Sequence, residues 1–403
     1  MDVKKLFKGI AVVIDDEIHD VKSSIYNILN QLKTESIPYV EYDSIPDVKI
    51  ADNLQNVSFV LLDWKLDSAI TDSEIISGVK LPAEEKKSNV EENIKFLKAI
   101  QKVCFCPIFI FTDEEISSIQ ETLKHNGLYR DGKCNTILIK SKSVFISAGS
   151  LFTELESWLK ETLSIYLLKS WDATCQTAKI NLFLDFQKRS PLWTKVLWDT
   201  YIKDGVNPSL ELGDFISKSI LGQMIPLSLE NSYFNDLQNT ISAKELIDCL
   251  ERQCFVDEKF LEKAVPETGD IFMDGGVTYI NIRPSCDLIP RKEGSTIDDV
   301  ELYLLQGEKV NDISTKKSSF FEKYGHFPEK DSNFIVFPIL RGSFVEFSLK
   351  DITKEKWSNM KSKRKGRLLH PYLTKLQIKY GAYIQRQGLP CLPNQIFNSS
   401  GTL

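Results

Sequence analysis

The first 160 residues alternate short apolar runs with segments of helical periodicity, and this alternation is the strongest constraint on the fold. Uninterrupted apolar strands are typical of parallel sheets, in which helices bury both faces. The predicted strands are Ile10–Ile14, Tyr39–Tyr42, Phe59–Leu62, Pro107–Phe111 and Thr136–Ile139. The predicted helices are Val21–Leu32, Ile94–Val103, Glu114–Lys124 and Ser150–Leu163. This order predicts an α/β domain with a doubly wound, five-stranded parallel sheet.

The pattern changes twice after this domain. Residues 164–268 have helical spacing, with helices expected at Leu197–Ile202, Leu210–Ile225 and Ala243–Gln253. From residue 269 the apolar period shifts towards two, and a last helix is expected at His370–Gln387. The later predicted strands are Val277–Ile282, Val300–Leu305, Asn333–Leu340 and Ser343–Leu349. We therefore predict three domains: 1–163, a helical connector at 164–268 and a strand-rich α+β module at 269–403.

Composition narrows the class of protein. Lys and Arg number 50 against 56 Asp and Glu, so the net charge of −6 excludes a globally basic nucleic-acid binder. Uncharged apolar runs are too short for a transmembrane span, and the N-terminus has the pattern of a strand and not of a signal peptide. The eight cysteines form no zinc-ligand spacing, so we expect reduced thiols in a cytoplasmic protein.

Polar side chains follow the predicted strands of the first domain. Asp15 and Asp16 follow the first strand, Asp63 the third, Thr112 the fourth and Lys140 the fifth. The carboxyl ends of parallel strands meet at one edge of a sheet, so these groups are expected together. Clustered carboxylates suit Mg²⁺, and beside such an ion a carboxylate can act as a nucleophile towards a phosphoryl group. An ammonium and a hydroxyl can then bind phosphoryl oxygens.

The segments IAVVIDDE, FVLLDW, IFIFTDE and ILIKS, in that order, resemble the receiver domain of two-component response regulators. The resemblance covers about residues 8–160 and implies a flavodoxin-like fold. It implies that Asp63 is the phospho-acceptor, and that Asp15, Asp16 and the backbone carbonyl of Lys65 hold Mg²⁺ with it. It further implies that Thr112 and Lys140 are the switch and phosphate-contact residues. The phosphoryl donor would be a sensor histidine kinase or a phosphotransfer protein.

The chain departs from the usual receiver pattern at three places. Ser141 stands where Pro usually follows the phosphate-contacting lysine, and Ile137 replaces the usual aromatic switch residue. The segment 67–93 after Asp63 is long and acidic, where receivers usually have a short turn. These departures put the usual coupling to an output face in question, and the long segment is either a lid or partner contact, or a surface insertion.

The second half contains one unusual polar spot, Arg283–Leu288 (RPSCDL), at the end of a predicted strand. Cys286, Asp287 and His370 are the candidate residues of an output site, in which a Cys/His pair would supply a nucleophile. The alternative is a buried thiol, with Asp287 capping a turn. The basic run Lys361–Arg367 invites a nucleic-acid interpretation, but such a charged run between a strand region and a helix is more often a solvated linker, which is the interpretation preferred here. Three aromatic side chains of the connector are expected in the core: Phe183, Trp193 and Trp198.

The segments YINIRPSCDL and HPYLTKLQIKYGAYIQRQGLP faintly resemble proteins of bacterial conflict and anti-phage defence operons. Three functions stay open for the chain as a whole. The first is a phosphorylated signalling protein that switches its C-terminal module. The second is a hydrolase or nuclease effector gated by the receiver, and the third is a module that binds a protein or nucleic acid without catalysis. No membrane partner is expected.

Overall fold

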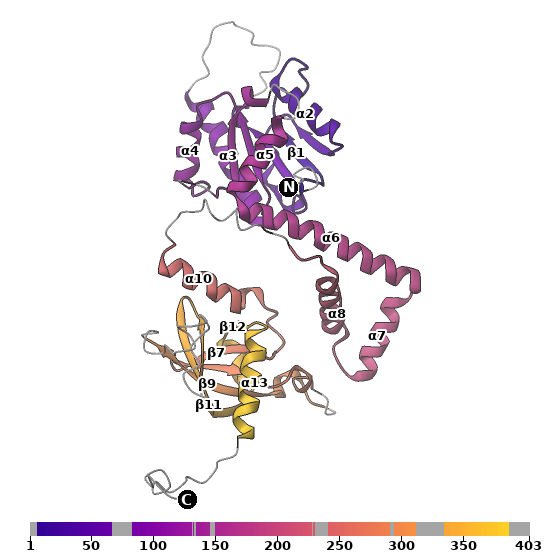
Figure 1. Cartoon of the computed structure of the whole chain (residues 1–403), viewed down its shortest axis with the longest axis vertical. Helices are drawn as coiled ribbons and strands as arrows, with labels where there is room; N and C mark the ends of the chain where they lie inside the picture. Colours follow the sequence, from indigo (N-terminus) through magenta and orange to yellow (C-terminus); the bar gives the residue numbers. More distant parts are fainter. Residues whose placement is uncertain are drawn as a thin grey trace, which may run out of the picture. The chain divides into compact units, whose positions relative to one another are not determined.

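The computed structural model describes residues 6–66, 83–130, 132, 134–145, 150–227, 229, 241–290, 294–311 and 334–386. The chain forms two compact units (Figure 1). The first comprises residues 1–202 and 207–238, and the second comprises residues 203–206 and 239–403. Most of the predicted helical connector therefore groups with the α/β domain, and the division into three domains stays a prediction.

The first unit contains the predicted five-stranded parallel sheet. Its order is β2-β1-β3-β4-β5, and every neighbouring pair is parallel. This strand order is that of the flavodoxin-like receiver fold, so the predicted fold class is confirmed. The strands are β1 (Ala11–Ile14), β2 (Tyr39–Tyr42), β3 (Phe59–Asp63), β4 (Ile108–Thr112) and β5 (Ile137–Ser141).

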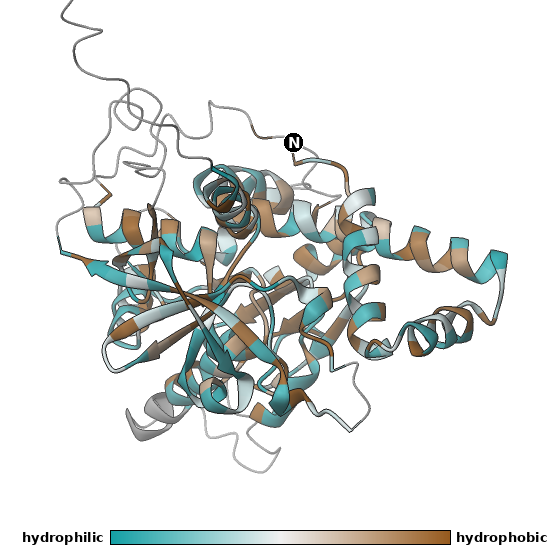
Figure 2. Cartoon of the chain, turned by 90° about the horizontal axis from the view of Figure 1, so that it is seen from below, coloured by the Kyte–Doolittle hydropathy of each residue, from teal (hydrophilic) through white to brown (hydrophobic). Residues whose placement is uncertain are grey.

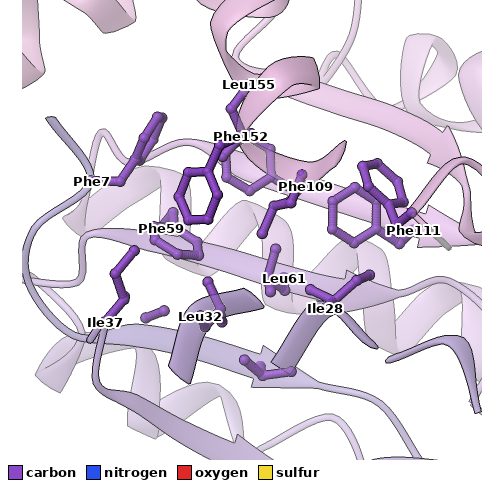
Figure 3. Close-up of a cluster of buried hydrophobic side chains, with 14 of the residues drawn as sticks. Phe7, Ile28, Leu32, Ile37, Phe59, Leu61, Phe109, Phe111, Phe152 and Leu155 are labelled. Atoms are coloured by element: carbon purple, nitrogen blue, oxygen red, sulfur yellow. The ribbon is translucent and has the colours of Figure 1, made fainter. Parts of the chain in front are cut away.

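Helices cover both faces of this sheet, which explains its apolar strands. Residues of α2 (Ser24–Thr34) and α5 (Ser150–Glu161) pack on one face, in a cluster rich in phenylalanine (Figure 3). Phe59 and Phe109, on adjacent strands, lie at the centre of this cluster with ring centroids 5.6 Å apart. Residues of α3 (Ala83–Val103) and α4 (Ile116–His125) pack on the other face. Because side chains alternate along a strand, each strand supplies both clusters.

One helix of the first unit begins earlier than the sequence predicts. Helix α3 begins at Ala83, eleven residues before the predicted start at Ile94, so part of the acidic segment 67–93 is helical. The rest of that segment, residues 67–82, lies outside the described residues. The hypothesis that it forms a lid or a partner contact therefore stays untested.

Three further helices follow the α/β part of the first unit: α6 (Leu163–Arg189), α7 (Trp193–Asp204) and α8 (Pro208–Gln223). Apolar and polar residues alternate along α6 to α8, the helices at the right of Figure 2. None of the side chains of α7 or α8 is buried. Phe183 and Trp198 are about two-fifths exposed, so the expectation that these aromatic residues lie in the core is wrong for both.

The second unit is built on a seven-stranded antiparallel sheet of order β10-β11-β9-β8-β7-β12-β6. Its strands are β6 (Phe255–Asp257), β7 (Asp270–Asp274), β8 (Val277–Asn281), β9 (Glu301–Val310), β10 (Phe334–Ile339), β11 (Ser343–Lys356) and β12 (Arg364–Leu368). Its helices are α10 (Ala243–Cys254), the short α12 (Trp357–Met360) and α13 (Tyr372–Gln385). Leu373 and Leu376 of α13 are buried in the core of this sheet.

Strand β12 corrects the interpretation of the basic run as a solvated linker. Arg364 is fully buried, and its guanidinium contacts the buried carboxylate of Asp270 at 3.2 Å. Arg364 also donates to the backbone carbonyls of Glu262 and Val265, and it lies over the ring of Trp357. A buried charge persists only where it is paired and hydrogen-bonded, and these contacts hold the two terminal nitrogens of the Arg364 guanidinium, while its Nε is buried with no hydrogen-bond partner. Residues 364–367 of the run therefore belong to an interior strand of the sheet, and Lys361–Lys363 form the short 3₁₀ helix η7 before it.

A search of the described helices for a span that could cross a lipid bilayer finds none, because none combines the necessary length with sufficient apolar character.

Candidate functional site

Three aspartates gather at the carboxyl edge of the parallel sheet. One carboxylate oxygen from each of Asp15, Asp16 and Asp63 lies within 4.8 Å of the others. Asp15 and Asp63 are buried, whereas Asp16 is partly exposed. The structure therefore brings these three residues together at one edge of the sheet, as the sequence predicts.

The register of the strands explains the convergence. Ala11 pairs with Phe59 and Ile14 pairs with Leu62, so Asp15, one residue beyond β1, is level with Asp63 at the end of β3. The backbone N–H of Glu17 donates to Asp15 Oδ1 at 2.9 Å, and the N–H of Lys65 donates to Asp63 Oδ1 at 3.2 Å. The other carboxylate oxygen of each residue, Oδ2, takes no part in these two bonds.

That second oxygen meets an ammonium that the sequence analysis did not select. Lys142 Nζ lies 2.9 Å from Asp63 Oδ2 and 2.9 Å from Asp15 Oδ2. Lys142 is itself buried, with 3% of its surface exposed. The buried cluster therefore holds two carboxylates and one ammonium in direct contact.

Lys140, the lysine chosen from the sequence, lies elsewhere. It lies two residues after Leu138 and therefore on the same face of the sheet, the face that α5 covers. Its ammonium pairs with Glu154 of α5 at 2.7 Å. Because β5 continues to Ser141, Lys140 precedes the end of the strand, and Lys142 is the first lysine beyond it. The lysine that contacts the aspartates at this edge is Lys142, and the structure does not bring Lys140 to them. Knowing where the strand ends would have identified Lys142.

Packing fixes the position of Lys142. This residue opens the short 3₁₀ helix η2 (Lys142–Phe145), and Phe145 at its other end is buried with its ring 4.3 Å from that of Phe111. The side chain of Gln31 donates to the carbonyl of Phe145 and accepts from the N–H of Leu151. Helix α2 thus ties η2 to α5, and the ammonium is held by a well-packed turn.

Two asparagines of α3 hold the turn that follows Asp63. Asn93 donates to the carbonyl of Trp64 at 2.7 Å, and Asn89 donates to the carbonyl of Leu66 at 2.8 Å. These two carbonyls flank Lys65, whose own carbonyl is the predicted backbone ligand. Asn93 is 1% exposed, so its amide is committed to this turn. Neither asparagine was among the candidate residues, because both lie within the segment 67–93 that was assigned to the acidic loop.

Thr112, the last residue of β4, is fully buried at the same edge. It pairs in register with Ser141, the residue before Lys142, and its hydroxyl accepts from the N–H of Glu114 at 3.0 Å. Its expected role as a switch residue stays a prediction. Ile137 is buried in the core with α3 and α4, so the position of the usual aromatic residue is filled by an aliphatic side chain.

Burial dominates the electrostatics of the cluster. Burial raises the pKa of Asp63 to about 7, although Lys142 opposes this change. Burial likewise raises the pKa of Asp15 against the influence of the same ammonium. For Lys142, burial disfavours the charged form, but the carboxylates of Asp63 and Asp15 outweigh it and raise its pKa. The positive charge of Lys142 therefore does not fully offset the unfavourable burial of the two negative carboxylates.

The donor set fits a hard divalent cation. Three carboxylates and the backbone carbonyl after Asp63 offer only oxygen ligands, which Mg²⁺ prefers. A cation here would also offset the desolvation that holds the pKa values of Asp15 and Asp63 above their ordinary range. Asp15, Asp16 and Asp63, with the carbonyl of Lys65, are the residues that would hold it.

The candidate residues of the second unit do not form a comparable cluster. Cys286 lies in the short 3₁₀ helix η4 (Ser285–Asp287), where its thiol contacts Asp287 at 3.7 Å. Cys286 is exposed, so the interpretation of a buried thiol is wrong. His370 Nδ1 lies 2.6 Å from the hydroxyl of Thr374. Among the described residues no hydrogen bond joins Cys286 to His370, and the proposed Cys/His pair stays without support.

The basic run offers little free charge to a nucleic acid. Besides Arg364, three of its cations pair with carboxylates of the same unit: Lys361 with Asp298, Lys363 with Asp274, and Arg367 with Asp270. Binding of nucleic acid depends on cations that are available to phosphates. These pairs do not favour the nucleic-acid interpretation.

Comparison with known proteins adds little to this geometry. No protein-family model matches the chain, and no curated protein matches it significantly. One similar solved structure is a signal receiver domain of a putative LuxO repressor protein from Vibrio parahaemolyticus, 16% identical, covering 40% of this chain and 97% of that chain with a TM-score of 0.22. Another is a yeast Spc42 trimeric coiled-coil fusion, 15% identical, covering 38% of this chain and 78% of that chain with a TM-score of 0.25. The fold assignment rests on the strand order and register described above.

Proposed function

We propose that this chain is a response-regulator-type signalling protein that accepts a phosphoryl group on Asp63 and thereby switches the segments that follow its receiver domain. The observation that carries the proposal is the contact of Lys142 Nζ with Asp63 and Asp15, beside the third aspartate, Asp16. Buried carboxylates that converge around one ammonium are typical of a functional site.

The proposed reaction is a phosphoryl transfer from a phosphohistidine of a sensor kinase or phosphotransfer protein. Asp63 Oδ2 would attack phosphorus as the P–N bond to the donor imidazole breaks, which yields an acyl phosphate and a free histidine. Mg²⁺, when bound, would neutralise charge on the phosphoryl oxygens. Lys142 would move from the carboxylate of Asp63 to a phosphoryl oxygen, and Thr112 would donate its hydroxyl to another.

Switching would follow from the change in charge. Phosphorylation converts Asp63 from a group with one negative charge at most into one with nearly two, so the contacts of Lys142 are redistributed. Lys142 is joined to Phe145 through η2, and Gln31 joins η2 to α5. Because α5 leads directly into α6, this route connects the site to the rest of the chain. The expected partner that supplies the phosphoryl group is the kinase. The expected output is a regulatory effect or an interaction with another molecule.

Mass spectrometry tests the proposal directly. The full chain is incubated with acetyl phosphate and Mg²⁺, and a species heavier by about 80 Da is expected, the mass of one phosphoryl group. Asp63→Asn should abolish the species, whereas Asp52→Asn, which changes an exposed aspartate of the same unit, should retain it. A chain that gains no mass, or that gains it equally after Asp63→Asn, contradicts the proposal.

A further inference from the structure

Helices α6, α7 and α8 bury very few of their apolar side chains. Together they form a helical arm, residues 163–223, that follows the α/β part of the first unit. No side chain of α7 or α8 is buried, and beyond Lys169 only Ala178 and Leu182 of α6 are buried. Helices in proteins owe most of their stability to the packing of an apolar face. Within its described residues the arm therefore has almost no core of its own.

Aromatic side chains join the three helices of the arm at one corner. Trp193, the first residue of α7, stacks on Phe186 of α6 with ring centroids 4.8 Å apart. Trp193 also meets Phe183 edge to face at 5.7 Å, and Phe186 meets Phe215 of α8 at the same distance. These contacts determine which side of each helix faces the other two.

The outer sides of α6 and α7 are apolar as well. Because an α-helix has 3.6 residues per turn, Trp198 and Ile202 lie on the side of α7 that points away from the aromatic corner. Ile180 and Leu184 likewise lie on the side of α6 opposite the buried Leu182. These four exposed side chains are 41–56% accessible to solvent. Apolar residues on all sides are typical of a helix that is buried on all sides, and Figure 2 shows such residues along α6 to α8.

The exposed apolar surface of the arm has the size of a dimer interface. Among residues 163–223, ten large apolar side chains are 40–64% exposed. At roughly 80–100 Å² each, they present about 800–1,000 Å² of apolar surface. A stable dimer buries about 800 Å² on each partner, whereas the largest apolar patch of a typical monomer is about 300–600 Å². The arm therefore exposes enough apolar surface for a stable association.

The charges of the arm favour a second copy of this chain over a strongly charged partner. The arm has seven Lys and Arg against six Asp and Glu, so two arms have little net charge with which to repel one another. Arg189 pairs with Asp185 and Lys218 pairs with Asp214, each one turn apart on the same helix at 2.8 and 2.6 Å. Nucleic acids and anionic membranes are bound by surfaces with a clear excess of positive charge. A nearly neutral, apolar surface instead suits an identical one.

We propose that the helical arm is a homodimerisation element, and that the arms of two copies of this chain pack against one another through the outer sides of α6 and α7. Pairing of one surface with the same surface of a second copy is the commonest form of association among soluble oligomers. Trp198 is the expected anchor, because tryptophan is among the residues that contribute most to such interfaces. The proposal is independent of phosphorylation at Asp63.

The first experiment measures the mass of the full chain by sedimentation velocity, without a phosphoryl donor and over a range of concentrations. At about 50 µM the mass should be twice the 46.1 kDa of one chain. The double variant Trp198→Lys, Ile202→Lys should raise the dissociation constant of the dimer at least about thirtyfold, as the loss of one anchor residue does. The double variant Val21→Lys, Val48→Lys adds the same charge at exposed apolar positions outside the arm, and it should stay within about threefold of the wild type. A monomer at every concentration, or equal effects of the two variants, overturns the proposal.

The second experiment locates the interface in the wild-type chain, so it does not depend on the folding of a variant. Unlabelled and ¹⁵N-labelled chains are mixed, equilibrated and crosslinked with an amine-reactive reagent. Mass spectrometry should find crosslinks of mixed isotopic composition between lysines of the two arms, among them Lys179, Lys188 and Lys203. Mixed crosslinks confined to segments outside the arm reject the assignment. A chain without mixed crosslinks also rejects it, and would mean that another part of the same chain or a different protein covers the arm. Neither readout depends on Asp63, so a failure of the phosphorylation assay leaves this test unaffected.

Discussion

Lys142 Nζ contacts Asp63 Oδ2 at 2.9 Å across 79 residues of sequence, and the same ammonium contacts Asp15 Oδ2 at the same distance. One cation therefore holds together the carboxylates that end β1 and β3. The three side chains come from segments that only the parallel sheet brings to one edge.

Separate substitutions of Lys142 and Lys140 distinguish a role in the site from a role in its surroundings. Lys142→Met should lower the extent of phosphorylation by acetyl phosphate by at least about tenfold, because a preorganised cation near the transferring group is lost. Lys140→Met is the matched control, since Lys140 pairs with Glu154 on the surface of α5. Its phosphorylation should stay within about twofold of the wild type. The assignment of Lys142 fails if Lys140→Met has the larger effect.

The stability of the first unit should depend on the ionisation of Asp63. The folded-state pKa is raised from 3.8 to about 7, so between these values the folded chain binds more protons than the unfolded chain. The stabilising contribution is complete below the unfolded pKa and is lost as the pH rises through 7. In magnesium-free buffer, Asp63→Asn should therefore be more stable than the wild type near pH 8, by at least about 1 kcal/mol, and should lose this advantage near pH 4.

Hydrogen exchange of the β1 and β3 peptides in urea measures this difference without requiring both units to unfold together. Asp52→Asn, at an exposed position of the same unit, is the matched control and should change stability by less than about 0.5 kcal/mol. Adding Mg²⁺ should stabilise the wild type more than Asp63→Asn, because the ion compensates the buried carboxylate. A difference between wild type and Asp63→Asn that does not vary with pH would contradict the raised pKa.

Asn93 is expected to hold the turn that carries the Lys65 carbonyl. Asn93→Ala leaves the carbonyl of Trp64 buried without its donor, which should cost about 1–3 kcal/mol in the stability of the first unit. Asn56→Ala, at an exposed position, should change stability by less than about 0.5 kcal/mol. The Mg²⁺ affinity, measured by calorimetry, should fall for Asn93→Ala only. Unchanged stability and affinity would show that the turn is held by other contacts.

Gly366 tests whether β12 is an interior strand. A Cβ at this position would collide with the ring of Phe255 and with the carbonyl of Val256 on the neighbouring strand β6. Gly366→Ala should therefore destabilise the second unit by about 1–3 kcal/mol, as overpacking does in cores. Gly381→Ala in α13 meets no atom within 4 Å and should be neutral or slightly stabilising, since alanine favours a helix.

Thermal unfolding followed by peptide-resolved hydrogen exchange distinguishes these variants. Protection in β6, β7 and β12 should fall after Gly366→Ala, while phosphorylation at Asp63 should continue. Tolerance of Gly366→Ala without loss of protection would restore the earlier interpretation of the basic run as a linker.

The sequence by itself determined the parallel sheet and most of the acidic site. Uninterrupted apolar runs can be buried only between two helical layers, and residues that follow parallel strands must share an edge. That reasoning places Asp15, Asp16, Asp63 and Thr112 without coordinates. It also predicted four strands of the second unit, because their apolar residues alternate with a period of two.

Only the tertiary structure decided which lysine reaches Asp63 and what becomes of the basic run. Lys140 and Lys142 are two residues apart, and the choice depends on where β5 ends and on the packing of Phe145 against Phe111. Arg364 appears solvated by local composition, but Asp270 and the carbonyls of Glu262 and Val265 compensate its burial. Local sequence cannot encode such outcomes, since each is set by partners far away along the chain that lie in contact only after folding.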